Sequence, residues 1–552
     1  MVDIASIRQL FLDDYIVDSL DGVIRRYHRP IRSIDKPVLG ATAPWEINSI
    51  GPFLFGGTVI YDEEDHIFKM WYRLDEPLEK APEGMREVVA EDGSITRRNW
   101  IEHAGLFKAA YATSTDGINW DRPILGVTEY QGSKINNILP SGTGGKSIIR
   151  RPAIIKDYLE ADPARKYKMA YVDNVNGKWS LEKAYSSNGI NWEMGVGDPA
   201  YFKSPVVPHG ALFGWDPRKE LWVHYSKKIG KRRIDVDGSE ISGLQAICRS
   251  TSKDFEHWGN TREIITANPF DPQMWSAGSH AILSAISYTD DLYIGLSDTV
   301  PARSAEDVQP SLIDTVGSMR QEHFTELFYS RDGINWNRTA PFFEFLKPGV
   351  WGTWDSELVL CSKPIVKDDQ ILFYYTGNNL QCNAHIPDHP QRELIGTVSG
   401  GVRSGYGIGV ASMRLDGFVS IDGDDPGGVL TTKPLVFNGD RLVLNARVPE
   451  GPDSNLSDTV PDFGVLRVEI TDKLGNTLSG YGDSDSDPVL GDSIEHVVSW
   501  NGKSDIGRLE GIPVRLRFHL KNSALYSFHT RSQKVVETSF STTEPGSRGR
   551  PS

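Results

Sequence analysis

Two carboxylates stand close together in the stretch 351–357, which reads Trp-Gly-Thr-Trp-Asp-Ser-Glu. If this stretch is an extended strand, Asp355 and Glu357 face the same side, because side chains alternate along a strand. Trp351 and Trp354 flank them. Hydrolysis of a glycosidic bond needs a pair of carboxyl groups beside the scissile bond, and aromatic rings stack on sugar faces. We therefore predict that Asp355 and Glu357 are catalytic.

Further polar residues are expected around the same site. Glu46 precedes the first predicted inner strand, and Asp14 lies on a predicted N-terminal strand, so both are additional catalytic candidates. An arginine at such a site lowers the pKa of a nucleophilic carboxyl group or binds a substrate oxygen. In the alternative interpretation, an arginine instead neutralises Asp355 or Glu357 as a core acid. Arg150 and Arg151 are the arginines considered for either role. The residues predicted to bind substrate are Arg150, Arg151, His209, Trp275, His280 and Trp354.

A repeated phrase organises the segments that must position these residues. Its copies read Ser-x-Asp/Asn-Gly-x-Asn-Trp, with a looser third copy and a fifth that lacks the Trp. Asp-Gly and Asn-Gly favour tight turns, so each copy predicts a hairpin that closes a small antiparallel sheet. Repeats at similar spacing are typical of β-propellers. The marker residues of the five copies are Asp116, Asn188, Asp254, Asp332 and Asp416.

Five units of this kind predict an all-β fold with a five-bladed β-propeller. Each unit has a first strand, a charged turn and an aromatic-rich second strand. We expect residues 1–426 to form the propeller, with the N-terminal strand closing the ring on the last blade. From about Gly427, alternating strands predict a C-terminal β-sandwich over 427–538, followed by a disordered tail over 539–552. The acids expected to be solvated in first turns are Asp62, Glu63, Glu64, Asp65, Asp216, Asp290, Asp291, Asp368 and Asp369.

Composition narrows the class of partner. The chain has 552 residues and a formal net charge of −15, which disfavours nucleic acid and anionic membranes as partners. A neutral carbohydrate is unaffected by that charge. Its three cysteines make neither a disulfide framework nor a zinc spacing, and the N-terminus has no signal-peptide pattern, so a cytoplasmic location is expected. No cofactor and no metal are predicted, and no apolar run is long enough to cross a membrane.

The phrases and the predicted domain order resemble the five-bladed glycoside hydrolases of families 32, 43 and 68. Three stretches are similar to bacterial family-32-like proteins: 10–15 (Leu-Phe-Leu-Asp-Asp-Tyr), 416–420 (Asp-Gly-Phe-Val-Ser) and 525–528 (Leu-Tyr-Ser-Phe). The resemblance implies an exo-acting hydrolase of a furanoside, such as a fructosyl or arabinosyl unit, with an accessory sandwich that can mediate a homo-oligomer. The three acidic motifs of family 32 are absent. Arg151-Pro152 lies near the place of the second motif, Arg-Asp-Pro on blade two. On blade three, His209-Gly210 stands where family 32 has Glu-Cys.

Two alternatives remain open at this stage. A phosphorylase or transglycosylase on the same fold needs a basic phosphate site, which Lys146, Arg150, Arg151 or Arg320 can supply. A non-catalytic carbohydrate-binding propeller predicts that no two channel carboxylates lie within about 5–10 Å of each other, the range that retaining and inverting glycosidases span.

Overall fold

The computed structural model describes residues 1–75, 87–89, 95–97, 107–140, 153–175, 178–195, 200–201, 206–229, 233–234, 240–241, 245–266, 283–299, 323–340, 343–380, 391–449 and 464–533. The described chain is nearly all β. Its helices are α1 (Pro44–Ile47) and three single 3₁₀ turns at Pro163–Arg165, Arg392–Leu394 and Gly507–Leu509. No helix within these ranges has the length and hydropathy to span a membrane.

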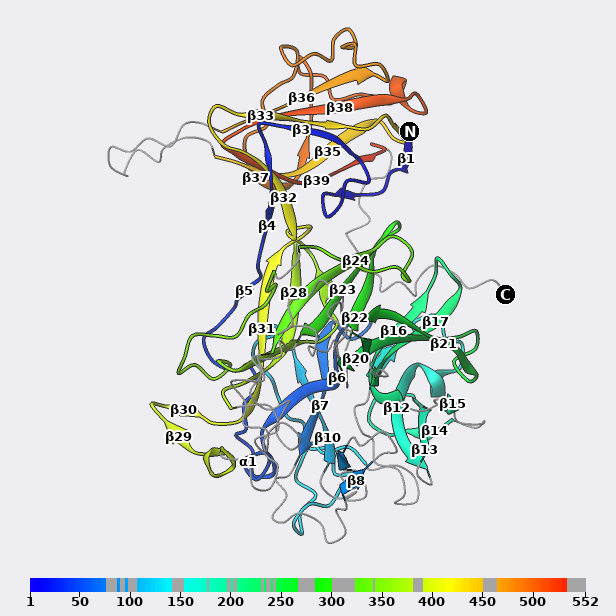
Figure 1. Ribbon diagram of the computed structural model, residues 1–552, viewed down its shortest axis with the longest axis vertical. Helices are drawn as coiled ribbons and strands as arrows, with labels where there is room; N and C mark the ends of the chain where they lie inside the picture. Colours follow the sequence, from blue (N-terminus) through cyan, green and yellow to red (C-terminus); the bar gives the residue numbers. More distant parts are fainter. Residues whose placement is uncertain are drawn as a thin grey trace.

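Five antiparallel sheets follow one another along the chain and form the larger, lower part in Figure 1. Sheet 1 contains β6 (Pro52–Asp62), β7 (Ile67–Asp75) and β10 (Phe107–Ser114). Sheet 2 contains β11 (Ala153–Lys156), β12 (Tyr167–Val175), β13 (Lys178–Ser186), β14 (Glu193–Met194) and β15 (Ala200–Tyr201). Sheet 3 contains β16 (Val206–Asp216), β17 (Leu221–Ile229), β20 (Gln245–Ser252) and β21 (Trp258–Thr266).

Sheet 4 contains β22 (Leu283–Thr289), β23 (Leu292–Thr299), β24 (Phe324–Ser330) and β25 (Asn337–Arg338). Sheet 5 contains β26 (Leu358–Cys361), β27 (Ile365–Lys367), β28 (Gln370–Asn378), β31 (Tyr406–Arg414) and β5 (Ile31–Arg32). The aromatic-rich runs predicted as second strands all lie in strands of these sheets. Three further hairpins pair β8 (Glu87–Val89) with β9 (Ile95–Arg97), β18 (Arg233–Ile234) with β19 (Glu240–Ile241), and β29 (Val398–Ser399) with β30 (Val402–Arg403).

The core of this part lies in the seams between successive sheets. Separate apolar clusters fill the seams between sheets 1 and 2, 2 and 3, and 3 and 4. Sheet 5 contacts sheet 4 through β26 and sheet 1 through β28, so the succession closes on itself. Threonine hydroxyls connect neighbouring sheets near their first strands: Thr58 accepts from Ile154 N at 2.9 Å, and Thr376 accepts from Leu54 N at 2.7 Å.

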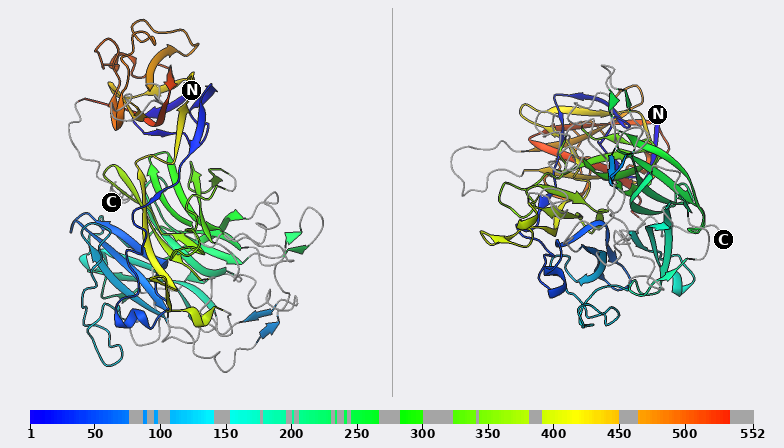
Figure 2. Two further views of the ribbon diagram at one scale, coloured as in Figure 1. Left: turned by 90° about the vertical axis from the view of Figure 1, so that its left-hand side faces the viewer. Right: turned by 60° about the horizontal axis from the view of Figure 1, so that its bottom comes forward.

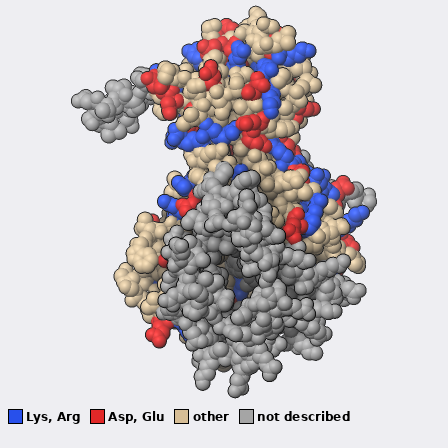
Figure 3. Space-filling view, viewed as in Figure 1, with Lys and Arg blue, Asp and Glu red and all other residues tan. Residues whose placement is uncertain are grey.

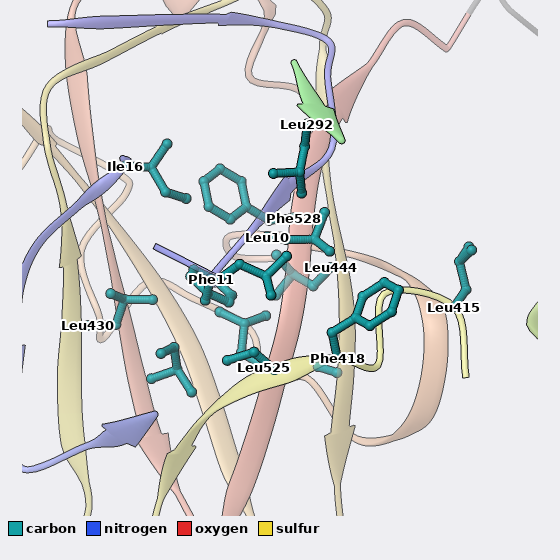
Figure 4. Close-up of a cluster of buried hydrophobic side chains, with 14 of the residues drawn as sticks. Leu10, Phe11, Ile16, Leu292, Leu415, Phe418, Leu430, Leu444, Leu525 and Phe528 are labelled. Atoms are coloured by element: carbon teal, nitrogen blue, oxygen red, sulfur yellow. The ribbon is translucent and has the colours of Figure 1, made fainter. Parts of the chain in front are cut away.

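Two six-stranded sheets form the upper part in Figure 1. Sheet 6 contains β1 (Val2–Ala5), β34 (Leu435–Phe437), β38 (Val514–Lys521), β33 (Gly428–Thr432), β3 (Val17–Asp21) and β36 (Val465–Asp472). Sheet 7 contains β37 (Gly491–Val497), β35 (Arg441–Val448), β39 (Ser523–Arg531), β32 (Val419–Gly423), β4 (Ile24–Tyr27) and β2 (Gln9–Leu10). One continuous apolar cluster runs from the seam of sheets 4 and 5 into these two sheets, and Figure 4 shows part of it around Phe11, Phe418 and Phe528.

The N-terminal segment corrects the expected domain boundary. Strands β1 to β4 pair within sheets 6 and 7, so residues 1–27 do not belong to the part predicted over 1–426. The strand that completes sheet 5 is β5, which pairs with β31 through Ala411 and Arg32. β32 already belongs to sheet 7, before the predicted boundary at 427. The tail over 539–552 lies outside the described residues.

The repeated phrases form turns, as predicted. In the first copy, Ser114 Oγ accepts from Gly117 N, and Asp116 Oδ1 accepts from Ile118 N and Asn119 N. The copies at Asn188, Asp254 and Asp332 use their side chains in the same way, and these three copies connect the third strand of a sheet to the fourth. The fifth copy differs because the chain leaves sheet 5 there and enters sheet 7.

Some first-turn acids are buried rather than solvated. Asp62 is fully buried and receives hydrogen bonds from Lys69 Nζ and Lys156 Nζ, each at 2.6 Å, and from Tyr167 OH at 2.9 Å. Burial opposes its ionisation, but these donors hold the pKa of Asp62 well below its ordinary value. Asp216 is also buried and accepts from Tyr293 OH. The prediction of solvated turn acids is therefore wrong for these two residues.

Candidate active site

The candidate site lies at the end of the five sheets where first strands begin and second strands end, which we call the loop end. At this end stand the starts of β6 and β26 and the ends of β7, β23 and β28. The hairpins β8–β9 and β18–β19, which connect second to third strands, project from the same side (Figure 2, left). Figure 3 looks onto this side of the molecule, where a basic side chain is visible.

Asp355 lies near the loop end, where it is buried and forms an ion pair with an arginine. It is 2% exposed, and its Oδ2 accepts from Arg32 Nε at 2.7 Å and from Tyr375 OH at 3.1 Å. Burial and the charge of Asp355 raise the pKa of the Tyr375 phenol, which therefore remains a donor. This is the core-acid alternative foreseen from the sequence, although its cation is Arg32 rather than Arg150 or Arg151. The contacts favour a positioning role for Asp355, and a catalytic role stays a prediction.

The assumption that Asp355 and Glu357 share one face of a strand is wrong. Residues 351–357 form turns and bends, and β26 begins only at Leu358. Glu357 is half-buried; its backbone N–H donates to Asn378 O at 2.9 Å and its carbonyl oxygen accepts from His323 N at 3.1 Å. These bonds fix Glu357 between sheets 4 and 5, one residue before the first strand of sheet 5.

The two tryptophans of this stretch have opposite environments. Trp354 is 5% exposed and stacks on Tyr375, with ring centroids 5.6 Å apart and planes 21° from parallel. The environment of Trp354 is therefore that of a core residue, which disfavours the predicted contact with substrate. Trp351 is 86% exposed. Of the two rings, only that of Trp351 is available to a ligand in solution.

Glu46 belongs to a closed network inside the molecule. It is fully buried in α1, and its Oε1 accepts from Tyr72 OH and from Arg122 Nε, each at 2.7 Å. Its Oε2 accepts from the backbone N–H groups of Thr42 and Ala43. Burial and the charge of Glu46 raise the pKa of Tyr72 well above its ordinary value. Because both oxygens of Glu46 are saturated by protein donors, the structure favours a structural role over the predicted catalytic one.

Asp14 does not lie at the loop end. Its side chain is 71% exposed and pairs with Arg25, and the flanking strands β2 and β3 belong to sheets 7 and 6. The prediction that Asp14 joins the other carboxylates at one site is therefore wrong.

The predicted substrate-binding residues cannot all be placed. Arg150, Arg151, Trp275 and His280 lie outside the described residues. His209 lies in β16, near the loop end, with its side chain outside the description.

One charged pair at the loop end of sheet 1 was not predicted from the sequence. Arg73 Nη2 donates to Asp75 Oδ2 at 2.6 Å, and the Arg73 guanidinium lies 4.7 Å from the centroid of the Phe53 ring. Arg73 and Asp75 are both buried, and Phe53 contacts the ring of Tyr406 at 5.1 Å. The only available signal was an acid and a base two residues apart at the end of an aromatic strand, which many exposed strands also have. Within the described ranges, no group of three or more His, Cys, Asp or Glu residues is arranged to hold a metal ion.

No protein-family model and no curated protein matches the chain. Among solved structures, one described as a glycoside hydrolase shares 15% identity at a TM-score of 0.40, over 70% of this chain and 92% of its own. An N-acetylgalactosamine deacetylase from F. plautii, in complex with blood group B trisaccharide, shares 11% sequence identity at a TM-score of 0.36. That match covers 72% of this chain and 97% of the deacetylase chain. An α-L-arabinanase from Penicillium chrysogenum shares 10% sequence identity at a TM-score of 0.32, and the match covers 71% of this chain and 99% of the arabinanase chain. The matches include glycoside hydrolases, the class that the sequence motifs resemble, but likeness this remote assigns neither activity nor site residues.

Proposed function

We propose that the protein is a glycoside hydrolase whose five lower sheets are the blades of a β-propeller and whose sheets 6 and 7 form a β-sandwich. The proposed active site is the loop end of the propeller, and the proposed substrate is a carbohydrate. A furanoside, such as a fructosyl or arabinosyl unit, is the first candidate, because the sequence motifs resemble those of furanoside hydrolases.

The proposed fold is supported by the contacts between sheets. Each sheet packs on the next, and sheet 5 packs on sheet 1, which is how the blades of a propeller are arranged. The four turn motifs support the same arrangement, because each occupies the equivalent position in its own sheet. In propellers, ligands bind where the first strands and the loops before them converge.

One observation carries the proposed chemistry. A single short segment at the loop end presents an 86% exposed Trp351 and, six positions later, the half-buried Glu357. Hydrolysis of a glycosidic bond uses a pair of carboxyl groups, and an exposed aromatic ring can stack on a sugar face. We assign Glu357 as a catalytic carboxyl group and Asp355 as the residue that positions the segment. The candidate for the second carboxyl group is Asp75, which lies at the same end, buried and paired with Arg73.

Asp355 also favours a second candidate function. Its burial and its ion pair with Arg32 weigh against the predicted catalytic pair with Glu357. A carbohydrate-binding propeller without hydrolytic activity needs no such pair.

The two candidates are separated by a hydrolysis screen on p-nitrophenyl furanosides and pyranosides, with the Glu357→Gln and Asp14→Asn variants beside the wild type. The hydrolase proposal expects the wild type to cleave at least one substrate and Glu357→Gln to lose about 10³-fold or more in kcat. Asp14→Asn removes a carboxylate that does not lie at the loop end, so this variant should keep full activity. Activity retained in Glu357→Gln removes that residue from the mechanism. A wild type that binds oligosaccharides without cleaving any supports the binding protein.

A further inference from the structure

The segment 349–355, which we call the Trp351 loop, presents an unusually exposed aromatic ring. Trp351 is 86% exposed and its neighbour Val350 is 77% exposed, whereas Trp354 in the same loop is 5% exposed. A tryptophan has more apolar surface to bury than any other side chain, so full exposure gives up a large favourable contribution to folding. The whole ring is therefore accessible to a ligand.

The backbone of the Trp351 loop is closed on itself. Gly349 N donates to Asp355 O at 3.0 Å, and Thr353 N donates to Val350 O at 3.0 Å. The Thr353 hydroxyl lies 2.8 Å from Val350 O and 3.0 Å from Asp355 Oδ1. Gly352 adopts a φ of +92°, a left-handed conformation that favours glycine and turns the chain directly after the tryptophan. The loop therefore fixes the backbone that carries Trp351 before any ligand arrives.

The base of the loop is anchored in the core. Asp355 is paired with Arg32, whose Nη2 also donates to Lys347 O at 2.6 Å, so one guanidinium holds both sides of the loop. Trp354, packed on Tyr375, fixes the same base by stacking. A loop backbone held this way loses little conformational freedom when a ligand binds, which favours affinity.

We propose that Trp351 is an outer binding platform that stacks on a sugar unit of the substrate lying away from the bond that is cleaved. This inference rests on the proposed function. Six residues span at most about 22 Å, so the Trp351 ring and Glu357 lie close enough for one oligosaccharide to contact both. The flat face of an exposed indole suits the C–H face of a sugar ring, and the rigid loop fixes the direction in which a longer substrate extends.

If Trp351 is such a platform, its effect on KM should depend on the length of the substrate. On the glycoside that the wild type cleaves, KM is measured for the p-nitrophenyl monoglycoside and for oligosaccharides of two to five units of the same sugar. Trp351→Ala should raise the KM for the longer substrates about tenfold, which corresponds to the loss of about one stacking contact. The same change should leave the KM for the monoglycoside unchanged. Trp351→Phe should restore most of the affinity. Val350→Ala, the exposed neighbour, should match the wild type on every substrate.

The outcomes separate this inference from the proposed function. A wild type that cleaves nothing is instead titrated calorimetrically with arabino- and fructo-oligosaccharides, the first candidate sugars, and weaker binding by Trp351→Ala still supports the platform. Equal KM values, or equal binding, in wild type and Trp351→Ala overturn it, whatever the enzyme cleaves. It is also overturned if Trp351→Ala instead converts a dimer to a monomer in sedimentation velocity, because a second copy of the chain would then cover the ring. Absence of both cleavage and binding in the wild type refutes the proposed function and the platform with it.

Discussion

Arg32 Nε donates a hydrogen bond to Asp355 Oδ2 over 2.7 Å and joins two segments that lie 323 positions apart in the chain. Arg32 lies on β5, the strand that completes sheet 5, and Asp355 ends the loop before β26, the first strand of the same sheet. The pair therefore closes sheet 5 from its last strand to its first. Burial disfavours the charged guanidinium, but Tyr375 and Asp355 outweigh that effect and raise the pKa of Arg32.

Removing the acid should destabilise the fold. Asp355→Ala leaves Arg32 without its partner in a half-buried place, and we expect a loss of about 3 kcal/mol in the free energy of unfolding by urea. The matched control is Asp14→Ala, which removes an exposed partner of Arg25 and should cost less than about 1 kcal/mol. Equal losses in the two variants would show that the buried pair contributes no more than a surface pair.

A second prediction concerns Asp416, the marker of the fifth phrase. Its Oδ1 accepts from Tyr288 OH at 2.8 Å, its Oδ2 accepts from Ser527 Oγ at 2.6 Å, and Arg8 Nη1 lies 3.6 Å from Oδ1. It thereby connects sheet 4, sheet 7 and the N-terminal segment. Asp416→Ala should cost about 4 kcal/mol, because several buried donors lose their acceptor.

The control for Asp416 is Asp116→Ala at the equivalent position of the first phrase. Asp116 bonds only within its own turn, so its removal should cost about 1 kcal/mol. Chemical denaturation of both variants checks the difference. If Asp116→Ala is the more damaging change, Asp416 does not connect the two parts of the molecule as described.

Much of the fold is predictable because it follows from local pattern. The runs Phe68–Tyr72 and Ile371–Tyr375 are short, mostly apolar and rich in aromatic residues, and they lie in β7 and β28. The phrase residues form turns because their hydrogen bonds close within a few positions. Strand pairing over long distances is different. Nothing local in residues 2–27 distinguishes a strand of sheet 6 or 7 from one that joins sheet 5.

The candidate site was harder to predict for the same reason. Asp62 looks like a solvated turn acid until Lys156, 94 positions away, is seen to cross the seam and bond to it. The alternation expected at Asp355 and Glu357 failed because Gly352 and Thr353 turn the chain there before β26 begins. Sequence pattern identified the segment that carries Glu357 and Trp351, but not the partner of each side chain.

A third prediction follows from His224, which is fully buried in β17. Burial lowers its pKa from 6.5 to about 3, so the folded protein holds it neutral while the unfolded chain protonates it below pH 6.5. Between pH 6.5 and 3 the unfolded state binds the extra proton, and stability falls as the pH falls. From pH 7 to pH 5 this histidine alone should cost about 2 kcal/mol.

Replacing His224 by Gln should remove that part of the acid sensitivity. Urea unfolding at pH 7 and pH 5 gives the change in stability for each protein, and the wild type should lose about 2 kcal/mol more than His224→Gln. The exposed His66→Gln serves as the control and should keep the dependence of the wild type. A His224→Gln variant with the same loss between the two pH values would mean that His224 is protonated in the folded state.

The last prediction tests the closure of sheet 5 on sheet 1. Tyr374 OH, on β28, donates to Gly117 O at 2.8 Å, and a Cβ on Gly117 would lie 2.5 Å from that same hydroxyl oxygen. Gly117 has a φ of +77°, and Gly126 has a φ of +68° with open space around it. Gly126→Ala should therefore cost about 1 kcal/mol from backbone strain alone. Gly117→Ala should cost about 3 kcal/mol, because the tyrosine must also move.

The clash and the backbone strain at Gly117 are separated by a double-mutant cycle. Tyr374→Phe removes the hydroxyl and should cost about 1 kcal/mol for the lost hydrogen bond. Because the phenylalanine ring has no oxygen where the new Cβ must fit, Gly117→Ala should be less damaging in the Tyr374→Phe background than in the wild type, by about 1 kcal/mol. Tyr374→Phe should not alter the cost of Gly126→Ala. Strictly additive costs at Gly117 and Tyr374 would mean that this contact does not hold sheets 5 and 1 together.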